Sequence, residues 1–340
     1  APRSIARMVV TELPNLSPAA LPRTHTLHNS PTSELYAAMM EGAPVVVKRT
    51  KITSRGEILR FEKEVALLLE CSHPNVVQPL AQMRAPPTYA FVMPLFAHGA
   101  LFGVLHNSGQ QLSLRGALSV IADVSSAVTH LHAVGVLHRD VKSDNVLLDG
   151  SWRAVLVDFN ASERTADIRE DIVAPSRPSG GFFKQFVVGT LPYMAPELLR
   201  SARGAAYTER CDVYSCGILA NEVLTQTIPY SDAQTEQVKL QTILEARYNY
   251  EQLTAAIATD GLRPCEPEAA AYPPSLLDLT RRCWAEVASR RPCASEMHDE
   301  IAELLRTAGG GGGGGDGGGG DGGGGGGGGA PRELFVTTAQ

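Results

Sequence analysis

The pattern of hydrophobic and polar residues divides the chain into two regions that meet near Gly99. In residues 26–93, short β-branched runs alternate with polar turns, which is typical of strands in a sheet. One stretch differs, because its apolar residues recur at helical spacing through residues 58–69. This apolar face consists of Phe61, Val65, Leu68 and Leu69. The first region is therefore expected to be a sheet with a single helix.

The second region has helical spacing. Apolar residues recur every three or four positions from Leu114 to Leu131, and Ser113 has a suitable side chain for the N-cap of this helix. Further helices are expected at residues 212–224, 276–284 and 295–305. A strand-rich half followed by a helical half predicts an α+β protein of two lobes with a cleft between them.

Composition and charge argue against several classes of protein. The 340 residues carry a formal net charge of -6, without the Lys/Arg block expected for nucleic acid or an anionic membrane surface. No apolar run approaches the roughly 20 residues that a membrane-spanning helix needs. The six cysteines have no C-x-x-C spacing: Cys71, Cys211, Cys216, Cys265, Cys283 and Cys293. They are expected to be reduced, mostly buried thiols, which indicates the cytoplasm or the nucleus.

Composition also divides the chain into parts. These are an irregular lead-in (residues 1–20), a folded domain (21–306) with lobes at about 21–95 and 96–306, a polyglycine linker (307–330) and a tail (331–340). The glycine tract cannot bury side chains, so a flexible spacer of roughly 25 Å root-mean-square span is expected. The chain begins at Ala1 without an initiator Met, as expected for part of a longer polypeptide.

The strongest chemical signal is Leu-His-Arg-Asp-Val-Lys-Ser-Asp-Asn at residues 137–145, followed by Val-Asp-Phe at residues 157–159. It would place two carboxylates, Asp140 and Asp158, and the amide of Asn145 on neighbouring hairpin loops. Phosphoryl transfer needs a base beside the nucleophile and metal ions that neutralise charge on the transferring group. Asp140 alone would mean little, because most surface aspartates are simply solvated. The whole string together with Asp158 is hard to produce by chance.

These motifs resemble those of the eukaryotic protein kinase domain over about residues 26–306. The resemblance implies a two-lobed kinase fold, with a small antiparallel β-sheet lobe that carries helix C and a larger helical lobe. It also implies ATP and Mg²⁺ as cofactors and a protein substrate with a serine or threonine acceptor. Asp140 would be the base, and Asn145 and Asp158 the magnesium ligands. Lys142 would neutralise the γ-phosphate.

Other matches concern the nucleotide. Lys48 resembles the strand lysine that contacts the α- and β-phosphates, and Glu64 resembles its partner on helix C. Taken alone, Lys48 fits an edge-strand lysine and Glu64 a solvated helix residue. The His-Pro-Asn-Val-Val run at residues 73–77 follows at the usual spacing and favours the pair. With Met93 as gatekeeper and a hinge after it, the positions that resemble the adenine site are Leu35, Val46, Met93, Pro94, Phe96 and Leu147.

The resemblance further implies a set of structural residues. Glu197, in the substrate-docking loop, would form an ion pair with Arg291. Asp212 would brace the backbone of the catalytic loop, and Thr190 would hydrogen-bond near the base. A hydrophobic stack that aligns the lobes in active kinases would consist of Leu68, Leu80, His138 and Phe159.

One residue of the catalytic loop suggests regulation. Arg139 directly precedes the base, and in kinases of this pattern such an arginine receives a phosphate from the activation loop. That loop would span residues 161–188. Its candidate acceptors are Ser162, Thr165, Ser176 and Ser179.

The substrate class follows from the same segments. Lys142, two residues after Asp140, resembles serine/threonine kinases, whereas tyrosine kinases usually carry Ala or Arg in this stretch. The Gly-Thr-Leu-Pro-Tyr-Met run at residues 189–194 likewise lacks the tryptophan of the tyrosine-specific loop. Asp-Val-Tyr-Ser at residues 212–215 and Cys-Trp at residues 283–284 look like the tyrosine-kinase-like group of serine/threonine kinases.

The chain departs from the family pattern at two places. The three positions of the glycine-rich loop hold His28, Ser30 and Ser33, so Cβ atoms stand where glycines let the backbone approach the phosphates. Pro31 removes a further N–H donor. Asn160 replaces the usual glycine after Asp-Phe, and asparagine adopts left-handed backbone conformations more readily than most residues. A working kinase is the favoured interpretation. The alternative is a pseudokinase that acts as a scaffold or allosteric partner.

Overall fold

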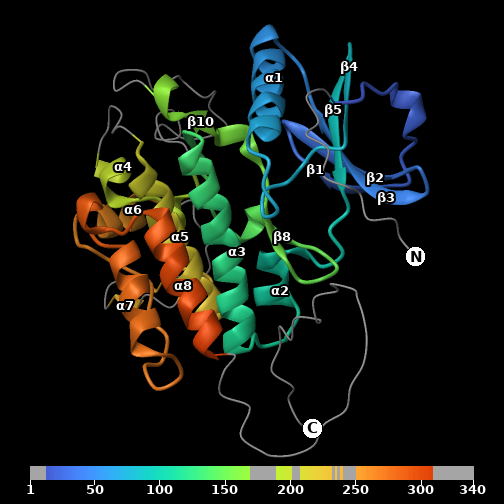
Figure 1. The fold of residues 1–340 in the computed structure, drawn as a ribbon. Helices are drawn as coiled ribbons and strands as arrows, with labels where there is room; N and C mark the ends of the chain where they lie inside the picture. Colours follow the sequence, from blue (N-terminus) through green and yellow to red (C-terminus); the bar gives the residue numbers. More distant parts are fainter. Residues whose placement is uncertain are drawn as a thin grey trace, which may run out of the picture.

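The computed structural model describes residues 13–168, 189–200, 207–231, 234–235, 238–239 and 250–308. A β-sheet with one long helix forms the first lobe, and a larger body of helices forms the second (Figure 1). This arrangement confirms the expected α+β fold of two lobes.

The sheet of the first lobe has five antiparallel strands in the order β1-β2-β3-β5-β4. The bounds are His25–Asn29 (β1), Ser33–Met40 (β2), Ala43–Thr50 (β3), Ala81–Ala85 (β4) and Thr88–Pro94 (β5). Since successive side chains of a strand point to opposite faces, β3 divides its valines between two clusters. Val46 joins the main core, whereas Val45 and Val47 join a smaller cluster with Leu21.

Helix α1, Arg55–Glu70, packs against the sheet through its apolar face. Phe61 and Val65 are both buried in the main core. At the N-terminus, the Glu57 carboxylate accepts the backbone N–H of Ser54 at 3.0 Å, which satisfies a donor just before the helix. The helix expected at residues 58–69 is thus confirmed and starts three residues earlier.

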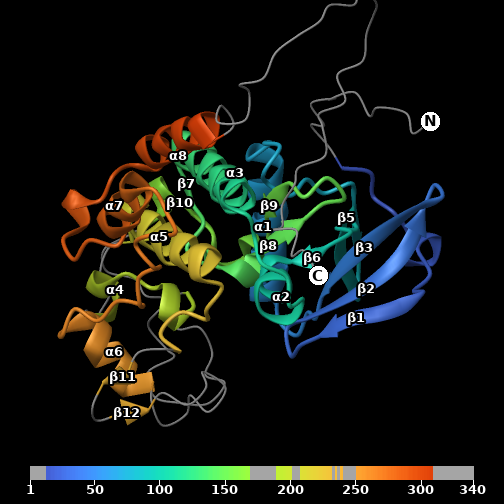
Figure 2. The ribbon, with the colours of Figure 1, turned by 90° about the horizontal axis from the view of Figure 1, so that it is seen from below.

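The second lobe is built mainly from helices. They are α2 (Leu101–Asn107), α3 (Leu114–Ala133), α4 (Pro196–Arg200), α5 (Glu209–Thr225), α6 (Tyr250–Ala258), α7 (Pro274–Cys283) and α8 (Ala294–Ala308). Helices α3, α5 and α8 lie side by side in its centre (Figures 1 and 2). Helices α5 and α7 approach so closely that a Cβ on Gly217 would stand 2.7 Å from that of Cys283.

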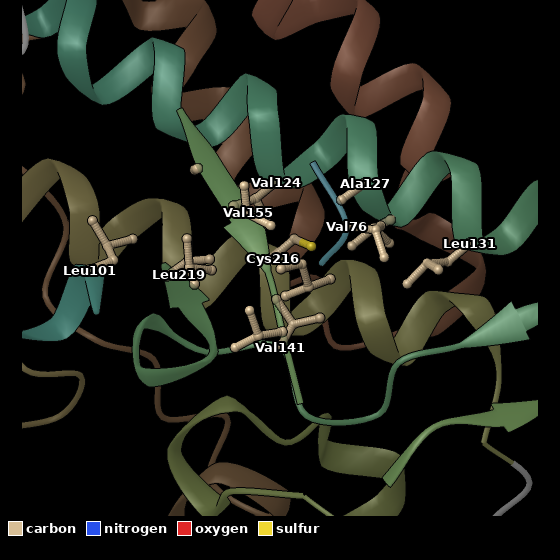
Figure 3. Close-up of a cluster of buried hydrophobic side chains, with 14 of the residues drawn as sticks. Val76, Leu101, Val124, Ala127, Leu131, Val141, Val155, Cys216 and Leu219 are labelled. Atoms are coloured by element: carbon tan, nitrogen blue, oxygen red, sulfur yellow. The ribbon is translucent and has the colours of Figure 1, made fainter. Parts of the chain in front are cut away.

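The core of this lobe fills the space between α3, α5 and a small sheet (Figure 3). That sheet has the order β6-β8-β9, with β6 at Gly99–Ala100, β8 at Val146–Leu148 and β9 at Ala154–Leu156. Two short ribbons complete the strands: β7 (Val136–Leu137) with β10 (Glu163–Arg164), and β11 (Gln234–Thr235) with β12 (Val238–Lys239). The β8–β9 hairpin carries the end of the catalytic loop toward Asp158.

All four helices predicted for this lobe are confirmed. The hydroxyl of Ser113 accepts the N–H of Gly116 at 2.9 Å, so it is the N-cap of α3. The short helices α2, α4 and α6 were not predicted, since five to nine residues give too few repeats to show a period. All six cysteines are free, and four of them are buried.

The expected boundaries of the domain need two changes. Leu13 is buried in the main core and Asn15 bridges to Gln82, so residues 13–20 are less irregular than expected. Helix α8 continues to Ala308, two residues into the expected linker. The rest of that linker and the tail lie outside the described residues. Within the described part of the chain, no helix has the length and apolar character to cross a membrane.

Candidate active site

The two lobes are joined by an ion triad. Nζ of Lys48, on β3, donates to Oε1 of Glu64 on α1 at 2.7 Å and to Oδ1 of Asp158 at 2.8 Å. The side chains of Lys48 and Glu64 are only 9% and 2% exposed, which excludes an edge-strand lysine and a solvated glutamate. Burial would lower the pKa of Lys48, but the two carboxylates outweigh it and raise this pKa above its usual value. Lys48 therefore stays charged.

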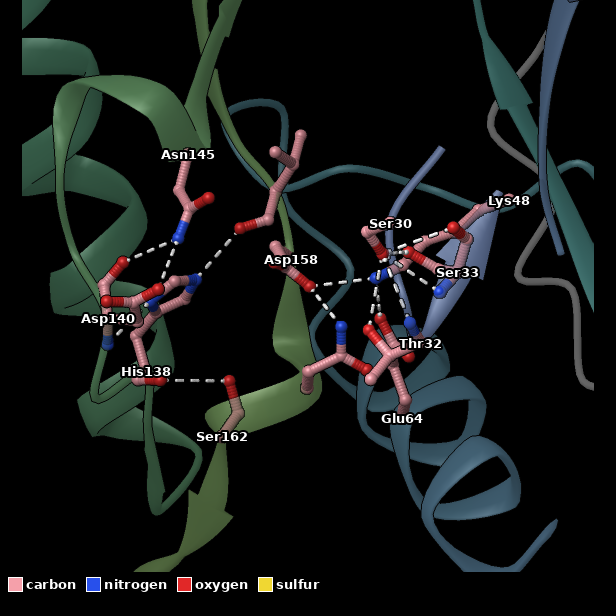
Figure 4. A network of polar contacts seen from close by, with 12 residues as sticks. Ser30, Thr32, Ser33, Lys48, Glu64, His138, Asp140, Asn145, Asp158 and Ser162 are labelled. Carbon is pink, nitrogen blue, oxygen red and sulfur yellow. Dashed lines mark hydrogen bonds and ion pairs between the residues drawn. The ribbon is translucent and has the colours of Figure 1, made fainter. Parts of the chain in front are cut away.

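Asp158, the third member of this triad, lies between Lys48 and the catalytic loop (Figure 4). Its side chain is 39% exposed. Burial tends to raise the pKa of this carboxyl, but the Lys48 ammonium holds it below the usual value, so Asp158 is ionised near neutral pH. Oδ1 accepts hydrogen bonds from both Lys48 and Asn160, and Oδ2 remains as a further acceptor.

Four of the predicted residues meet at the catalytic loop, three from the loop itself and Thr190 from the docking loop. Thr190 donates to Oδ1 of Asp140 at 2.7 Å, and Nζ of Lys142 donates to the Thr190 hydroxyl at the same distance. Lys142 also lies 2.8 Å from Oδ2 of Asp140. The Asn145 amide donates to Oδ2 and to the backbone carbonyl of Asp140, at 2.9 and 2.8 Å. A carboxylate and an ammonium thus stand side by side, held in place by a hydroxyl and an amide.

The backbone of this loop is fixed from helix α5. Oδ2 of Asp212 accepts the N–H of His138 at 2.9 Å, and Oδ1 accepts the N–H of Arg139 at 2.8 Å. Nε2 of His132 lies 3.0 Å from Oδ2. Burial would raise the pKa of Asp212, but these donors keep it below its usual value. Asp212 therefore braces the loop as expected.

The residues after Asp158 differ in part from expectation. Asp158 itself has the left-handed backbone, with φ 65°, whereas Asn160 lies in a short 3-10 turn. The expectation that Asn160 uses left-handed geometry is therefore wrong, and its amide instead donates to Asp158 at 2.6 Å. Phe159 meets His138 edge-on at 5.1 Å between ring centroids. Leu80 does not belong with them, because it packs against the cluster on the other face of the sheet.

The positions that resemble the adenine site surround the junction of the lobes. Val46 pairs with Met93 across β3 and β5, and both side chains are buried in the main core. Pro94 ends β5, which places the expected hinge directly after the sheet. The remaining members, packed partly buried against the same core, are Leu35, Phe96 and Leu147.

The docking loop is anchored by a bidentate ion pair. Both terminal nitrogens of Arg291 donate to the Glu197 carboxylate, each at 2.7 Å. The Arg291 side chain is fully buried, so the pair lies against the helical lobe as expected. Hydrogen bonds and the charge of Arg291 outweigh burial and lower the pKa of Glu197.

A second buried carboxylate beneath this loop was missed. Glu222, on α5, accepts hydrogen bonds from Tyr193 at 2.6 Å and from Ser143 at 2.7 Å. Nε2 of His106 lies 2.8 Å from the same carboxylate. Glu222 therefore ties the docking loop to the catalytic loop. Its place within the helical run around residues 212–224 gave no sign of this, since the sequence does not show which donors converge on a helix face.

The activation loop is only partly described. Ser162 is 2% exposed and its hydroxyl lies 3.2 Å from the His138 carbonyl, so its assignment as a phosphate acceptor is wrong. Thr165 is exposed and remains a candidate. Ser176 and Ser179 lie outside the described residues. Arg139, expected to receive the phosphate, faces Glu163 at 3.6 Å.

The oxygen atoms of the site suit a hard divalent cation. Asn145 uses its amide nitrogen for both of its hydrogen bonds to Asp140, which leaves its side-chain carbonyl oxygen available as a ligand. Mg²⁺ is usually bound by one or two protein oxygens together with substrate phosphates. Elsewhere in the described residues, no three His, Cys, Asp or Glu side chains gather as a metal site. The His130 ring stacks on His73, whereas His132 contacts Asp212, so the two imidazoles have different partners.

Comparison with known proteins agrees with this geometry. Residues 32–300 match the family model described as "Protein kinase domain". A "Protein kinase and PP2C-like domain-containing protein" of Arabidopsis thaliana is 36% identical over 80% of this chain, and a rice protein of the same name is 33% identical over 84%. The chain spans only 42% and 45% of these two relatives.

Other relatives carry the name of the substrate class. "Serine/threonine/tyrosine-protein kinase HT1" of Arabidopsis thaliana is 32% identical over 76% of this chain and 60% of its own length. A "Probable serine/threonine-protein kinase" of Dictyostelium discoideum is 29% identical over 79% of this chain and 26% of its own length. The expected resemblance to serine/threonine kinases, including the tyrosine-kinase-like kind, is confirmed. The chain belongs to the protein kinase family.

Proposed function

We propose that this chain is an active serine/threonine kinase, which transfers the γ-phosphate of ATP to hydroxyl groups of proteins. The observation that carries the proposal is the pairing of Asp140 with Lys142 and Thr190, at 2.7–2.8 Å, opposite the Lys48–Asp158 ion pair. A base, a cation for the transferring group and a cation for the other phosphates are thus all present.

Each residue has a distinct role in the proposed reaction. Asp140 accepts the proton of the substrate hydroxyl while the oxygen of that hydroxyl bonds to the γ-phosphorus. The bond between the γ-phosphorus and the β-phosphate oxygen breaks at the same time, and ADP leaves. Lys142 neutralises charge on the γ-phosphoryl group. Lys48, held by Glu64, binds the α- and β-phosphates. Stabilising this charge at fixed positions supplies most of the rate enhancement.

Magnesium would be held by Asn145 and Asp158. It would neutralise charge on the β- and γ-phosphates. The chain itself provides two oxygen ligands there, and the Asp140 bonds to Asn145 orient the first of them.

The acceptor class follows from the catalytic loop. The Lys142 bond to Thr190 links the loop to the docking segment, and both residue types are those of serine/threonine kinases. Relatives with such names support the same class.

The test is transfer of labelled phosphate from Mg-ATP to a generic basic protein. Asp140→Asn is the matched control, because it keeps the size of the side chain and removes the base. Transfer by the wild-type protein, reduced at least a hundredfold in the variant, would support the proposal. Equal rates would assign the transfer to a contaminant or to another residue.

One observation favours the alternative, a pseudokinase that acts as a scaffold. The turn between β1 and β2 has no glycine at the three expected positions, and its N–H groups are used within the turn. If folded wild-type protein with a phosphorylated activation loop binds Mg-ATP and transfers nothing, the scaffold function is the correct one.

A further inference from the structure

The turn that joins β1 to β2, residues 30–33, is closed by its own groups. The Ser30 hydroxyl oxygen accepts the backbone N–H of Ser33 at 3.0 Å and that of Thr32 at 3.3 Å. The N–H of Ser30 donates to the Ser33 carbonyl at 2.9 Å. Pro31 has no N–H. Every backbone donor of the turn is therefore already paired within it.

The same turn is also held by Lys51, the residue that directly follows β3. Nζ of Lys51 donates to Oδ1 of Asn29 at 2.6 Å and to the Ser30 carbonyl at 2.5 Å. The N–H of Lys51 donates to the Thr32 carbonyl at 2.9 Å. These bonds do not involve the Ser30 hydroxyl, so we expect the turn to keep its shape when that hydroxyl is removed.

The turn stands at the phosphate end of the proposed nucleotide site. Ser33 begins β2, and Leu35, two residues further on, pairs with Lys48 in the sheet. Figure 4 draws the turn residues with the Lys48–Glu64–Asp158 group. Backbone N–H groups of such a turn are natural donors to phosphate oxygens. Here those of Thr32 and Ser33 are occupied by one hydroxyl.

We propose that Ser30 sets the affinity of the site for phosphate, by competing for the N–H groups of Thr32 and Ser33. This inference rests on the proposed function, because it concerns the nucleotide of that reaction. A charged phosphate oxygen accepts stronger hydrogen bonds than a hydroxyl, so it can displace the Ser30 oxygen. Each nucleotide must then break two existing bonds before it gains its own, and binding is weakened accordingly.

The experiment compares two substitutions at one position. Ser30→Ala removes the hydroxyl and keeps the Cβ, whereas Ser30→Thr keeps both. Calorimetric titration of the full chain with Mg-ATP should give a Kd about tenfold lower for Ser30→Ala, and one within about twofold of wild type for Ser30→Thr. Adenosine lacks the phosphates, so its Kd should be the same for all three proteins.

Several results would overturn the inference. Unchanged or weaker Mg-ATP binding by Ser30→Ala would show that the hydroxyl does not compete. An equal gain in Ser30→Thr, or an equal gain for adenosine, would place the cause elsewhere. Ser30→Gly is the second variant without the hydroxyl. Unfolding of both Ser30→Ala and Ser30→Gly would contradict the inference too, because Lys51 is expected to hold the turn alone.

The same titration separates this inference from the proposed function. Wild-type binding of Mg-ATP that Ser30→Ala does not change would overturn the role of Ser30 and leave the kinase proposal standing. If neither the wild type nor Ser30→Ala bound Mg-ATP at millimolar concentration while folded, both the proposed function and the role of Ser30 would be contradicted.

Discussion

The Arg139 guanidinium faces the carboxylate of Glu163 at 3.6 Å, and the same carboxylate binds Lys63 of helix α1. One acidic residue at the start of the activation loop therefore connects the catalytic loop to the helix that carries Glu64. A neighbouring pair, Arg164 with Glu70, joins the same segment to the same helix. The helix is thus held toward the active site by unmodified side chains.

The first prediction concerns this connection. In the wild type, Glu163 already supplies the negative charge beside Arg139, so removal of loop phosphate should lower the transfer rate by no more than about threefold. In Glu163→Gln that charge is gone, and the same treatment should lower the rate at least about tenfold. The measurement is the rate before and after phosphatase, with loop phosphate followed by mass spectrometry. A wild type that depends on phosphate as strongly as the variant would contradict the role of Glu163.

The second prediction tests the ion triad. Lys48→Met and Asp158→Ala should each reduce phosphate transfer by at least about a hundredfold, because each deletes charge stabilisation on the phosphates. Lys48→Met also leaves Glu64 buried without its counter-charge, so a lower unfolding temperature is expected for that variant. The Asp158→Ala variant should unfold near the wild-type temperature, because the Asp158 side chain is more exposed. Wild-type rates in both folded variants would show that the site is wrongly assigned.

The third prediction concerns the bond between Arg291 and Glu197. Glu197→Gln leaves a fully buried guanidinium without a counter-charge and should lower the free energy of unfolding by about 3–5 kcal/mol. Arg291→Met combined with Glu197→Gln should cost less than the sum of the single changes, because no charge is then left unpaired. Urea denaturation of the four proteins gives the coupling. Strict additivity would mean that the two side chains do not interact in solution.

The fourth prediction is a pH dependence. Burial lowers the pKa of His138 below its usual value, so this imidazole is neutral in the folded protein when the unfolded chain is protonated. The unfolded state then binds more protons below about pH 6.5, and the contribution of His138 to stability is lost as the pH falls. His138→Phe should flatten the fall in unfolding free energy between pH 6.5 and 5, by up to about 1.4 kcal/mol per pH unit.

The control for this experiment is built into the comparison. The other histidines are the same in both proteins, so their titration cancels when the two slopes are subtracted. Chemical denaturation at four or five pH values supplies the slopes. Parallel curves for the wild type and His138→Phe would mean that His138 titrates alike in the folded and unfolded states.

The sequence predicts those parts of the site in which residue type and spacing determine the partner. Lys48, Glu64 and Asp158 were assigned to one site from their motifs, and the structure brings them within hydrogen-bonding distance. The helical period of α3 was equally clear, because its apolar residues recur every three or four positions from Leu114 to Leu131. Such signals lie within a short stretch of sequence or repeat along it, so they can be recognised without knowing how the elements pack.

The sequence does not predict contacts that depend on how elements dock. The contacts of Glu163 with Arg139 and of Glu222 with Tyr193 join segments that are far apart in the chain. Leu80 was misplaced because its side chain turns to the far face of the sheet, which its position in the run does not show. The self-paired turn around Ser30 likewise depends on the rotamer of one hydroxyl.

Asp212 holds the catalytic loop through two main-chain N–H groups, one on each carboxylate oxygen. Asparagine offers a single acceptor oxygen and could not reproduce both bonds, so this position tolerates little divergence. The Asp212 carboxylate contacts only the backbone of His138 and Arg139, so it places no restriction of its own on these two side chains. Substitutions at these two positions, during evolution or in a laboratory selection, can therefore leave the backbone anchor just before Asp140 in place.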